Sequence, residues 1–280
     1  MGMLTSQKII EYYDRFKSIE VTFTKELIHV AGLITKQVHL KCGSDIWPCV
    51  IFSSTFEKAK IVVNVKTGIL QKLEQANQMA SLRFCFKTSD TPNPVTFFVN
   101  TKVTGNSPYG GSNDVLLFNL QFTQRPPDDL IEIIGRVLDA NVNSKKRRNE
   151  RIPINNDTER RLHLVSKECA VFIENVPRRC IMRDISYSGT KVIMMGIAKF
   201  LVGKDVALRI EFDDPRESFL VKGKFLRDEV VEGRKELIAM VVEFEENTVP
   251  MGYKIRLNDF LIQVRAAERL SDDAGDGQQD

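Results

Sequence analysis

Short apolar runs rich in β-branched and aromatic residues dominate the first part of the chain. They are VTFT, LIHVAGLI, PCVIFSS, AKIVVNV, SLRFCF, VTFFVNTKV and DVLLFNLQF, and turn-forming or charged residues separate each run from the next. Runs of this length and composition predict antiparallel strands. We expect about six to eight strands, forming a barrel-like domain. Helical spacing of apolar residues also predicts helices over residues 5–16 and 70–78.

The clearest helical pattern begins after Arg125. Proline suits the first turn of a helix, and Asp128 can cap the free N–H groups there. Apolar residues then recur at helical spacing, at Leu130, Ile133, Ile134, Val137 and Leu138. The pattern fades after residue 142, so we predict a helix over residues 128–142 and a domain boundary near residue 143.

The second half of the chain again reads as strands separated by turn residues. The runs are LHLVS, CAVFIE, RCIMRDIS, TKVIMM, DVALRIEF, SFLVKGKFL and ELIAMVVEF. They predict a meander long enough to close, followed by a helix that begins near Tyr253 and includes Val264. The fold class is therefore mainly β with flanking helices. Residues 1–142 form one domain, residues 143–270 the second, and the polar residues 271–280 a disordered tail.

Composition supports two domains in a reducing compartment. The chain has 280 residues, of which 42% are apolar, and a net charge of +3 from 40 basic and 37 acidic residues. This nearly balanced charge does not indicate a protein that binds nucleic acid non-specifically over its whole surface. Because no apolar run is long enough for a membrane span or a signal peptide, we expect a cytoplasmic protein, and we expect a monomer.

The cysteines and histidines do not suggest a metal site. The five cysteines are scattered without a CxxC pair, and the chain has three histidines. His29 and His39 each lie in a predicted strand without a partner at ligand spacing, and the single tryptophan, Trp47, is expected to pack in the core. We therefore expect free thiols, no metal and no cofactor.

The candidate chemistry lies in two short segments. The sequence NSKKRRNERIP, residues 143–153, contains a basic cluster made of Lys145, Lys146, Arg147, Arg148 and Arg151. Two arginines four residues apart in a non-helical linker can converge on one planar anion or base edge. The sequence RDISYSGTKV, residues 183–192, adds an acceptor in Asp184, a hydroxyl in Ser186, and in Gly189 a residue that lets the backbone approach a ligand closely or take a positive φ.

Three interpretations of the basic cluster remain open at this point. It could be a solvated charge run in a linker, a phosphate-binding face of a nucleic-acid-binding barrel, or part of a specific nucleotide site. An enzyme is not indicated, because the chain has no Ser-His-Asp arrangement, P-loop or GxGxxG motif. Asp184 argues against general nucleic-acid binding, since a carboxylate repels phosphate.

The RxxxR motif of Arg147 and Arg151, followed by the DxSxxG motif of Asp184, Ser186 and Gly189, resembles the PilZ domain, a bacterial receptor module for cyclic di-GMP. Residues 115–152 also resemble the corresponding region of two-domain spirochaetal PilZ proteins. The resemblance implies a six-stranded antiparallel barrel with a terminal helix in the second domain, a PilZN-like first domain, and a role in regulating motility or virulence. The downstream partner is not readable from the sequence.

The resemblance also implies a role for each residue of the two motifs. Arg147 and Arg151 would clasp guanine Hoogsteen edges and phosphate, and Asp184 would accept from guanine N1 and N2. Ser186 and Gly189 would hold phosphate or guanine edges. Further residues are expected to contact the phosphates of the ligand or to form a lid over it: Lys145, Lys146, Arg148, Asn149 and Ser188. A ligand held by linker and barrel together would rearrange the two domains.

The chain departs from the usual PilZ pattern at three positions. Many PilZ sequences have glycine at the position of Ser188 and an apolar residue near Asn149 or Glu150. The polar residues found here are expected to shift the binding pose or stoichiometry. We also expect Glu150 to pair with one of the neighbouring arginines.

Overall fold

The computed structural model describes residues 5–66, 68–88, 93–234 and 236–275. The chain divides into two compact units, Met1–Leu138 and Asp139–Asp280. The division falls inside helix α4 (Asp128–Lys146). This helix continues four residues beyond the predicted end at residue 142, so Lys145 and Lys146 lie on its last turn, where cations complement the helix dipole.

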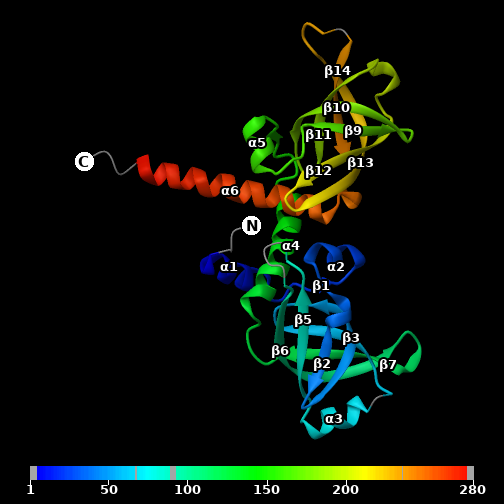
Figure 1. The fold of residues 1–280 in the computed structure, drawn as a ribbon, viewed down its shortest axis with the longest axis vertical. Helices are drawn as coiled ribbons and strands as arrows, with labels where there is room; N and C mark the ends of the chain where they lie inside the picture. The colour runs from blue at the N-terminus through cyan, green and yellow to red at the C-terminus, as the bar shows by residue number, and fades with distance from the viewer. Residues whose placement is uncertain (1–4, 67, 89–92, 235, 276–280) are drawn as a thin grey trace. The chain divides into compact units, whose positions relative to one another are not determined.

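The first unit contains a closed antiparallel barrel (Figure 1). Its strands are β1 (Val21–Thr22), β2 (His39–Cys42), β3 (Asp45–Ser54), β4 (Lys58–Asn64), β5 (Met79–Phe86), β6 (Val95–Tyr109) and β7 (Ser112–Phe122). Strand β1 pairs only with β3, and the other six close a ring through the β3–β4 and β4–β7 pairings. Helices α1 (Ser6–Phe16), α2 (Lys25–Ala31) and α3 (Ile69–Gln75) and the short helix η1 (Thr35–Gln37) complete the unit.

Helix α2 corrects the prediction of a strand over LIHVAGLI. Thr24 caps its first turn by accepting from the Leu27 N–H, and Gly32 ends it in the left-handed conformation with φ of 71°. These capping signals outweigh the strand propensity of the apolar run between them. His29 consequently lies on a helix, whereas His39 lies on strand β2 as predicted.

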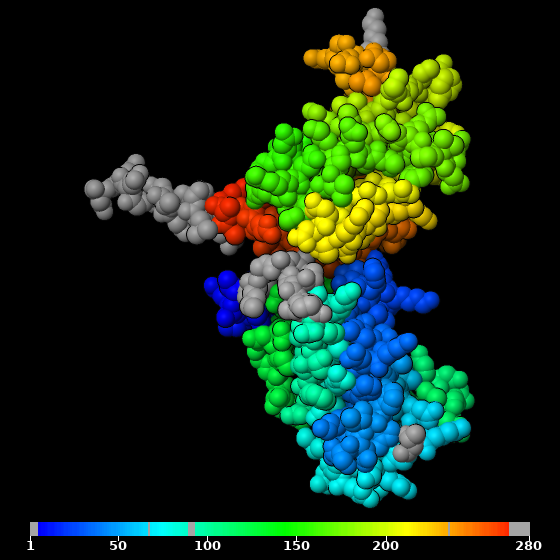
Figure 2. All heavy atoms as spheres, in the orientation of Figure 1, coloured from blue at the N-terminus to red at the C-terminus, as the bar shows by residue number. Residues whose placement is uncertain are grey.

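The second unit contains another closed antiparallel barrel. Its strands are β8 (Ile152–Pro153), β9 (Glu168–Ile173), β10 (Val176–Ile185), β11 (Gly189–Met195), β12 (Asp205–Asp213), β13 (Arg216–Val230) and β14 (Leu237–Phe244). Strand β8 pairs only with β10, and strands β9 to β14 close the ring through the β10–β11 pairing. The predicted six-stranded antiparallel barrel is therefore confirmed. Strand β13, yellow to light orange in Figure 2, lies on the visible surface of this unit.

Two further segments of the second unit differ from the sequence prediction. LHLVS contributes only an isolated bridge between Leu164 and Phe212, because it follows helix α5 (Asn156–Arg161) through a turn. The sequence analysis did not predict α5. Its signal was present: Asn155 and Thr158 form a capping box at its N-terminus.

Helix α6 (Met251–Gly275) is the predicted terminal helix, and its apolar face packs on the barrel core. Tyr253, Leu257, Phe260 and Leu261 are buried there, and Val264 packs against the same cluster. Buried Arg256 donates to the carbonyl oxygens of Asp214 and Pro215 and to Glu217. The two remaining short helices are η2 (Ala198–Phe200) and η3 (Glu246–Thr248).

Part of the predicted disordered tail, residues 271–275, is helical. Helix α6 extends over these residues, because extending an existing helix costs far less than starting one. Residues 276–280 of the predicted tail lie outside the described residues. None of the described helices is both long and apolar enough to cross a membrane.

Candidate functional site

A strand of two residues joins the arginine motif to the barrel. Ile152 and Pro153 form β8, which pairs antiparallel with the end of β10 in the register Asp184 with Pro153 and Ile185 with Ile152. The Ile154 N–H also donates to the Arg183 carbonyl at 2.8 Å. This register carries the residue before β8, Arg151, to the edge of β10.

Arg151 and Asp184 form an ion pair as a consequence. Arg151 Nη1 donates to Asp184 Oδ1, and the same carboxylate oxygen accepts the Lys191 backbone N–H at 2.9 Å. The Arg151 side chain is 38% exposed and that of Asp184 is 16% exposed, so the guanidinium still reaches solvent. The structure therefore brings one residue of each predicted motif into direct contact.

The start of the arginine motif is fixed by helix α4. The Arg147 N–H donates to the Asn143 carbonyl at 2.8 Å, which continues the helical hydrogen bonding. Asn143 Nδ2 donates to Asn258 on α6 at 2.8 Å, and Asn258 in turn donates to Asp139 at 3.2 Å. The motif is therefore attached to the second unit at both ends and is not a free linker.

Acidic residues hold the middle of the motif. Arg148 donates to Glu246 at 2.9 Å and lies 3.7 Å from a carboxylate oxygen of Glu243. Glu150 accepts two hydrogen bonds of 2.8 Å from Arg265 on α6. The prediction that Glu150 pairs with an arginine of the motif is therefore wrong: the segment turns Glu150 toward α6, where it fixes the backbone between the two arginines.

The turn from Ser186 to Gly189 is built by the Ser186 hydroxyl. This hydroxyl is fully buried, accepts from the backbone N–H of Gly189 at 3.1 Å and donates to the Gly189 carbonyl at 3.0 Å. Ser188 reaches back to the arginine segment, since its Oγ donates to Asn149 Oδ1 at 2.9 Å and its N–H donates to the Arg148 carbonyl at 3.1 Å. Two of the three polar residues that depart from the PilZ pattern, Ser188 and Asn149, thus bond to each other.

Glycine is required at position 189 for a reason different from the predicted one. A Cβ atom there would lie 2.2 Å from the Val242 carbonyl oxygen of β14, and its φ is not positive. The glycine allows β11 to approach β14 where the barrel closes. Gly223 plays the same part from β13, with the Glu243 carbonyl 2.4 Å from the position of a Cβ.

Two buried polar atoms next to this turn have no hydrogen-bond partner among the described residues, Arg147 Nη1 and Tyr187 Oη. Burial raises the pKa of the Tyr187 hydroxyl, and the negative charge of Glu150 raises it further, while Arg147 lowers it. Tyr187 therefore stays a neutral donor. Unlike Tyr187, buried Tyr253 is satisfied, because its hydroxyl donates to the Ser186 carbonyl at 2.9 Å.

Neighbours of the motif-defining residues line a small cleft of about 230 Å³, but Arg147, Arg151, Asp184, Ser186 and Gly189 are not part of that lining. Its lining includes Lys145 and Arg148 from the arginine segment, Tyr187 and Ser188 from the turn, and Glu246 from η3. Ligand pockets for drug-sized molecules measure roughly 300–1,000 Å³. The cleft is therefore smaller than the usual pocket for a drug-sized molecule.

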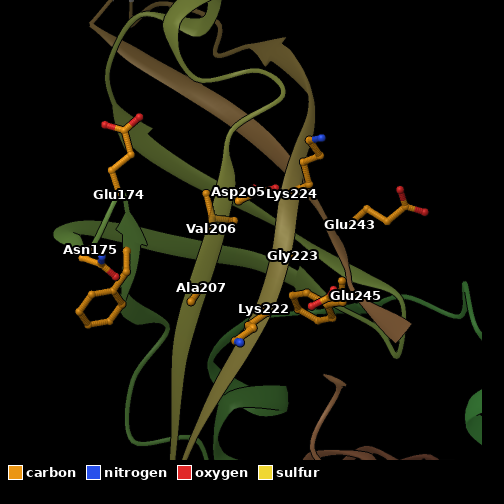
Figure 3. A pocket seen from close by; sticks show the side chains of 12 residues that line it. Glu174, Asn175, Asp205, Val206, Ala207, Lys222, Gly223, Lys224, Glu243 and Glu245 are labelled. Carbon is orange, nitrogen blue, oxygen red and sulfur yellow. The ribbon is translucent and has the colours of Figure 1, made fainter. Parts of the chain in front are cut away.

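A larger pocket of about 620 Å³ lies elsewhere on the second barrel (Figure 3). Its charged lining consists of Glu174, Asp205, Lys222, Lys224, Glu243 and Glu245. Four carboxylates against two lysines give this pocket an excess of negative charge, which disfavours a phosphate-bearing ligand. It contains no residue of either motif.

The structure places the other predicted residues on the surface around the cleft. Lys145, Lys146, Arg148, Asn149 and Arg151 are exposed, whereas Asp184 and Ser188 are half-buried. Sequence reasoning missed Glu246, Arg265, Tyr187 and Tyr253. Tyr187 could have been found because it lies inside the DxSxxG motif, but the partners on η3 and α6 carry no local signal.

The described residues contain no cluster of three or more His, Cys, Asp or Glu side chains able to hold a metal.

These features define a protein of two antiparallel barrels, the second of which docks an arginine-rich segment beside an Asp-Ser-Gly turn. The family model of the PilZN3 domain matches residues 7–141, and that of the PilZ domain matches residues 145–263. The chain is 43% identical over 276 residues to the cyclic di-GMP binding protein of Treponema denticola, covering 98% of this chain and 88% of the relative. The chain belongs to the PilZ family, with a PilZN3 domain followed by a PilZ domain.

Solved structures give a more distant likeness. The crystal structure of Borreliella burgdorferi PlzA in complex with c-di-GMP is 23% identical, with a TM-score of 0.41, covering 92% of this chain and 99% of that chain. Escherichia coli YcgR in complex with c-di-GMP is 13% identical, with a TM-score of 0.32, covering 88% and 90%. The family assignment rests on the family models and on the Treponema relative.

The two tyrosines beside the turn should respond in opposite ways to removal of their hydroxyls. Tyr253→Phe leaves the buried Ser186 carbonyl without its donor and should lower the free energy of unfolding of the second domain by about 1–3 kcal/mol. Tyr187→Phe removes a hydroxyl that has no partner among the described residues and should be neutral or stabilising. Urea unfolding of both variants, followed by circular dichroism, measures the difference. Equal losses in the two variants would contradict the assigned hydrogen bonding.

Proposed function

We propose that this protein is a cyclic di-GMP receptor that binds the dinucleotide on the second barrel, across the arginine segment and the turn of residues 184–189. The observation that carries the proposal is the β8–β10 pairing, which places Arg151 beside Asp184 and so joins two motifs far apart in the sequence. The Treponema relative, a cyclic di-GMP binding protein by name, supports the same ligand.

The chemistry of the site matches the demands of this ligand. Cyclic di-GMP presents two guanines and two phosphates, so its receptor needs planar cationic forks and a carboxylate acceptor. Arg151 and Arg147 supply the forks, which bind guanine O6 and N7 or phosphate in two-point fashion. The Arg147 Nη1 group has no partner among the described residues and is buried, so a ligand reaches this donor only if the side chain moves. Asp184 supplies the acceptor for guanine N1 and N2.

The remaining residues of the two motifs have supporting roles in this proposal. Exposed Lys145, Lys146 and Arg148 raise the local positive potential that attracts phosphate. Ser186 and Gly189 act as positioning residues, because the serine hydroxyl is occupied in the turn and the glycine is needed for barrel closure. Backbone groups of the turn and Ser188 are the contacts that remain for the ligand on this side.

Binding has to replace contacts that the protein makes with itself. Arg151 is paired with Asp184 and Arg148 with Glu246, so a ligand that engages these arginines competes with carboxylates. Because these pairs are partly exposed, each is worth about 0–1 kcal/mol, which a bidentate contact to phosphate or guanine exceeds. The acidic partners therefore moderate affinity and favour ligands that can satisfy Asp184 as well.

The role we infer is that of a receptor rather than an enzyme, acting in the cytoplasm as a monomer. The fold presents no nucleophile paired with a base at the cleft, where arginine, lysine and serine side chains gather. Five free cysteines are consistent with a reducing compartment.

We further propose that ligand binding changes the arrangement of the two domains. Helix α4 belongs to both compact units, and the arginine motif starts directly after its last residue, Lys146. A ligand that draws Arg147 and Arg151 into new contacts acts on the end of that helix. Such a signal requires the ligand to bind one arrangement more tightly than the other.

The arginine pair gives the most direct mutational test of the binding site. Arg147→Ala and Arg151→Ala should each weaken cyclic di-GMP binding about 5- to 150-fold, since a bidentate arginine contact is worth about 1–3 kcal/mol. The double variant should show no measurable binding by isothermal titration calorimetry. Arg234→Ala, which removes an exposed arginine in the loop between β13 and β14, is the charge-matched control and should bind normally.

The same titration separates the proposal from a nucleic-acid-binding barrel. An unchanged affinity in the double variant would place the ligand elsewhere. If oligonucleotides compete with cyclic di-GMP and their affinity falls steeply with salt and rises with length, the basic cluster is a general phosphate-binding face instead.

The domain rearrangement is tested by small-angle X-ray scattering of the full chain with and without saturating cyclic di-GMP. We expect a change in the radius of gyration at constant mass, with the mass of a monomer. Limited proteolysis of residues 140–152 should change in parallel, because ligand contacts replace the contacts of Arg148 and Arg151. If both measurements stay the same while calorimetry confirms binding, the protein is a rigid receptor.

A further inference from the structure

Two cysteines face each other across strands of the second barrel, away from the motifs discussed above. Cys169 of β9 and Cys180 of β10 are direct partners in the antiparallel register, and their Sγ atoms are 3.2 Å apart. Directly opposed residues in antiparallel strands have Cα atoms about 4.5–5.5 Å apart, within the range of about 4.4–6.8 Å that a disulfide spans. The backbone is therefore already placed for a bond between them.

The two thiols differ in access. Cys180 is 3% exposed and belongs to the hydrophobic core of the barrel, whereas Cys169 is half-buried and packs at the edge of that core. A small oxidant reaches Cys169 first, and Cys180 stands behind it. This is the arrangement of an attacking thiol with a resolving thiol.

The thiols also differ in acidity. The hydrogen bond between the two thiols lowers the pKa of Cys169, while the same interaction and burial raise the pKa of Cys180. In the first domain, burial raises the pKa of Cys42, and it raises the pKa of Cys49 to about 12. Because the thiolate is the reactive form, Cys169 is favoured over these cysteines as the nucleophile.

A zinc site does not explain the pair. Zinc is held in proteins by three or four protein ligands, and no group of three candidate side chains occurs among the described residues. Two thiols without further ligands fit redox chemistry better than zinc binding.

We propose that Cys169 and Cys180 form a reversible dithiol–disulfide site whose oxidant is a hydroperoxide. The Cys169 thiolate attacks the peroxide, the O–O bond breaks, and Cys169 becomes a sulfenic acid while hydroxide leaves and takes up a proton. The Cys180 thiol then attacks the sulfenic sulfur, the S–O bond breaks, and a second water leaves. Hydrogen peroxide gains two electrons, the two thiols lose two, and a dithiol reductant reverses the change.

Oxidation at this place would affect the strand that carries the ligand site. The bond would lock β9 to β10, and β10 continues from Cys180 to Asp184. The proposal does not depend on the identity of the ligand bound there.

Tryptic mass spectrometry of the folded, full-length protein tests the proposal. Trypsin cleaves after Lys167, Arg178, Arg179 and Arg183, so Cys169 and Cys180 fall in separate peptides, residues 168–178 and 180–183. After brief treatment with hydrogen peroxide, these peptides should appear joined, with two hydrogen atoms lost. Dithiothreitol should restore both free peptides, and circular dichroism confirms that the protein stays folded.

Single variants identify the order of events. In Cys180→Ser, peroxide should leave a sulfenic acid on Cys169 that dimedone traps, and in Cys169→Ser no adduct should form on Cys180. Cys42, Cys49 and Cys85 are internal controls, and after denaturation of the peroxide-treated protein all three should still be alkylated as free thiols. Failure of the two peptides to join in the folded wild-type protein, or joining of Cys169 to Cys169 of a second molecule instead, would overturn the proposal.

Discussion

The pairing of β8 with the end of β10 is the constraint on which the candidate site depends. Two residues, Ile152 and Pro153, add a short strand to an otherwise complete barrel and thereby set the position of everything just before them. Arg151 reaches Asp184 because of this register, and the Glu150–Arg265 pair turns the preceding residue toward α6. An arginine-rich segment that could have remained a solvated charge run is thus held beside the turn of residues 186–189.

The barrel supplies the second half of the site through packing. Gly189 and Gly223 let neighbouring strands approach β14 closely, and Tyr253 of α6 donates to the Ser186 carbonyl. The turn is therefore held from inside by Tyr253 and from outside by the hydrogen bond between Ser188 and Asn149. On the side of the turn the candidate site is preorganised. On the side of the arginine segment the side chains of Arg148 and Arg151 can change partners, because their ion pairs are partly exposed.

Local signals were sufficient to predict the architecture from the sequence, and long-range partners were not. Alternating apolar residues predicted strands in both barrels, and helical spacing from Tyr253 to Val264 predicted α6. The LIHVAGLI run was misread because its caps, Thr24 and Gly32, were weighed less than its β-branched residues. In the site, the two motifs were visible as patterns, but Glu246 and Arg265 are brought to Arg148 and Glu150 only by the fold. The buried role of Ser186 likewise depends on a turn geometry that composition does not encode.

The central claim is that the arginine motif and the Asp-Ser-Gly turn form one binding site. A double-mutant cycle on cyclic di-GMP affinity tests it most directly, using Arg151→Gln and Asp184→Asn, which remove the charge of each residue and leave a polar side chain in its place. If both side chains serve one ligand, the loss in the double variant should differ from the sum of the single losses by about 0.5–3 kcal/mol. Losses that add within about 0.3–0.5 kcal/mol, or a wild-type protein that does not bind cyclic di-GMP, would contradict the account.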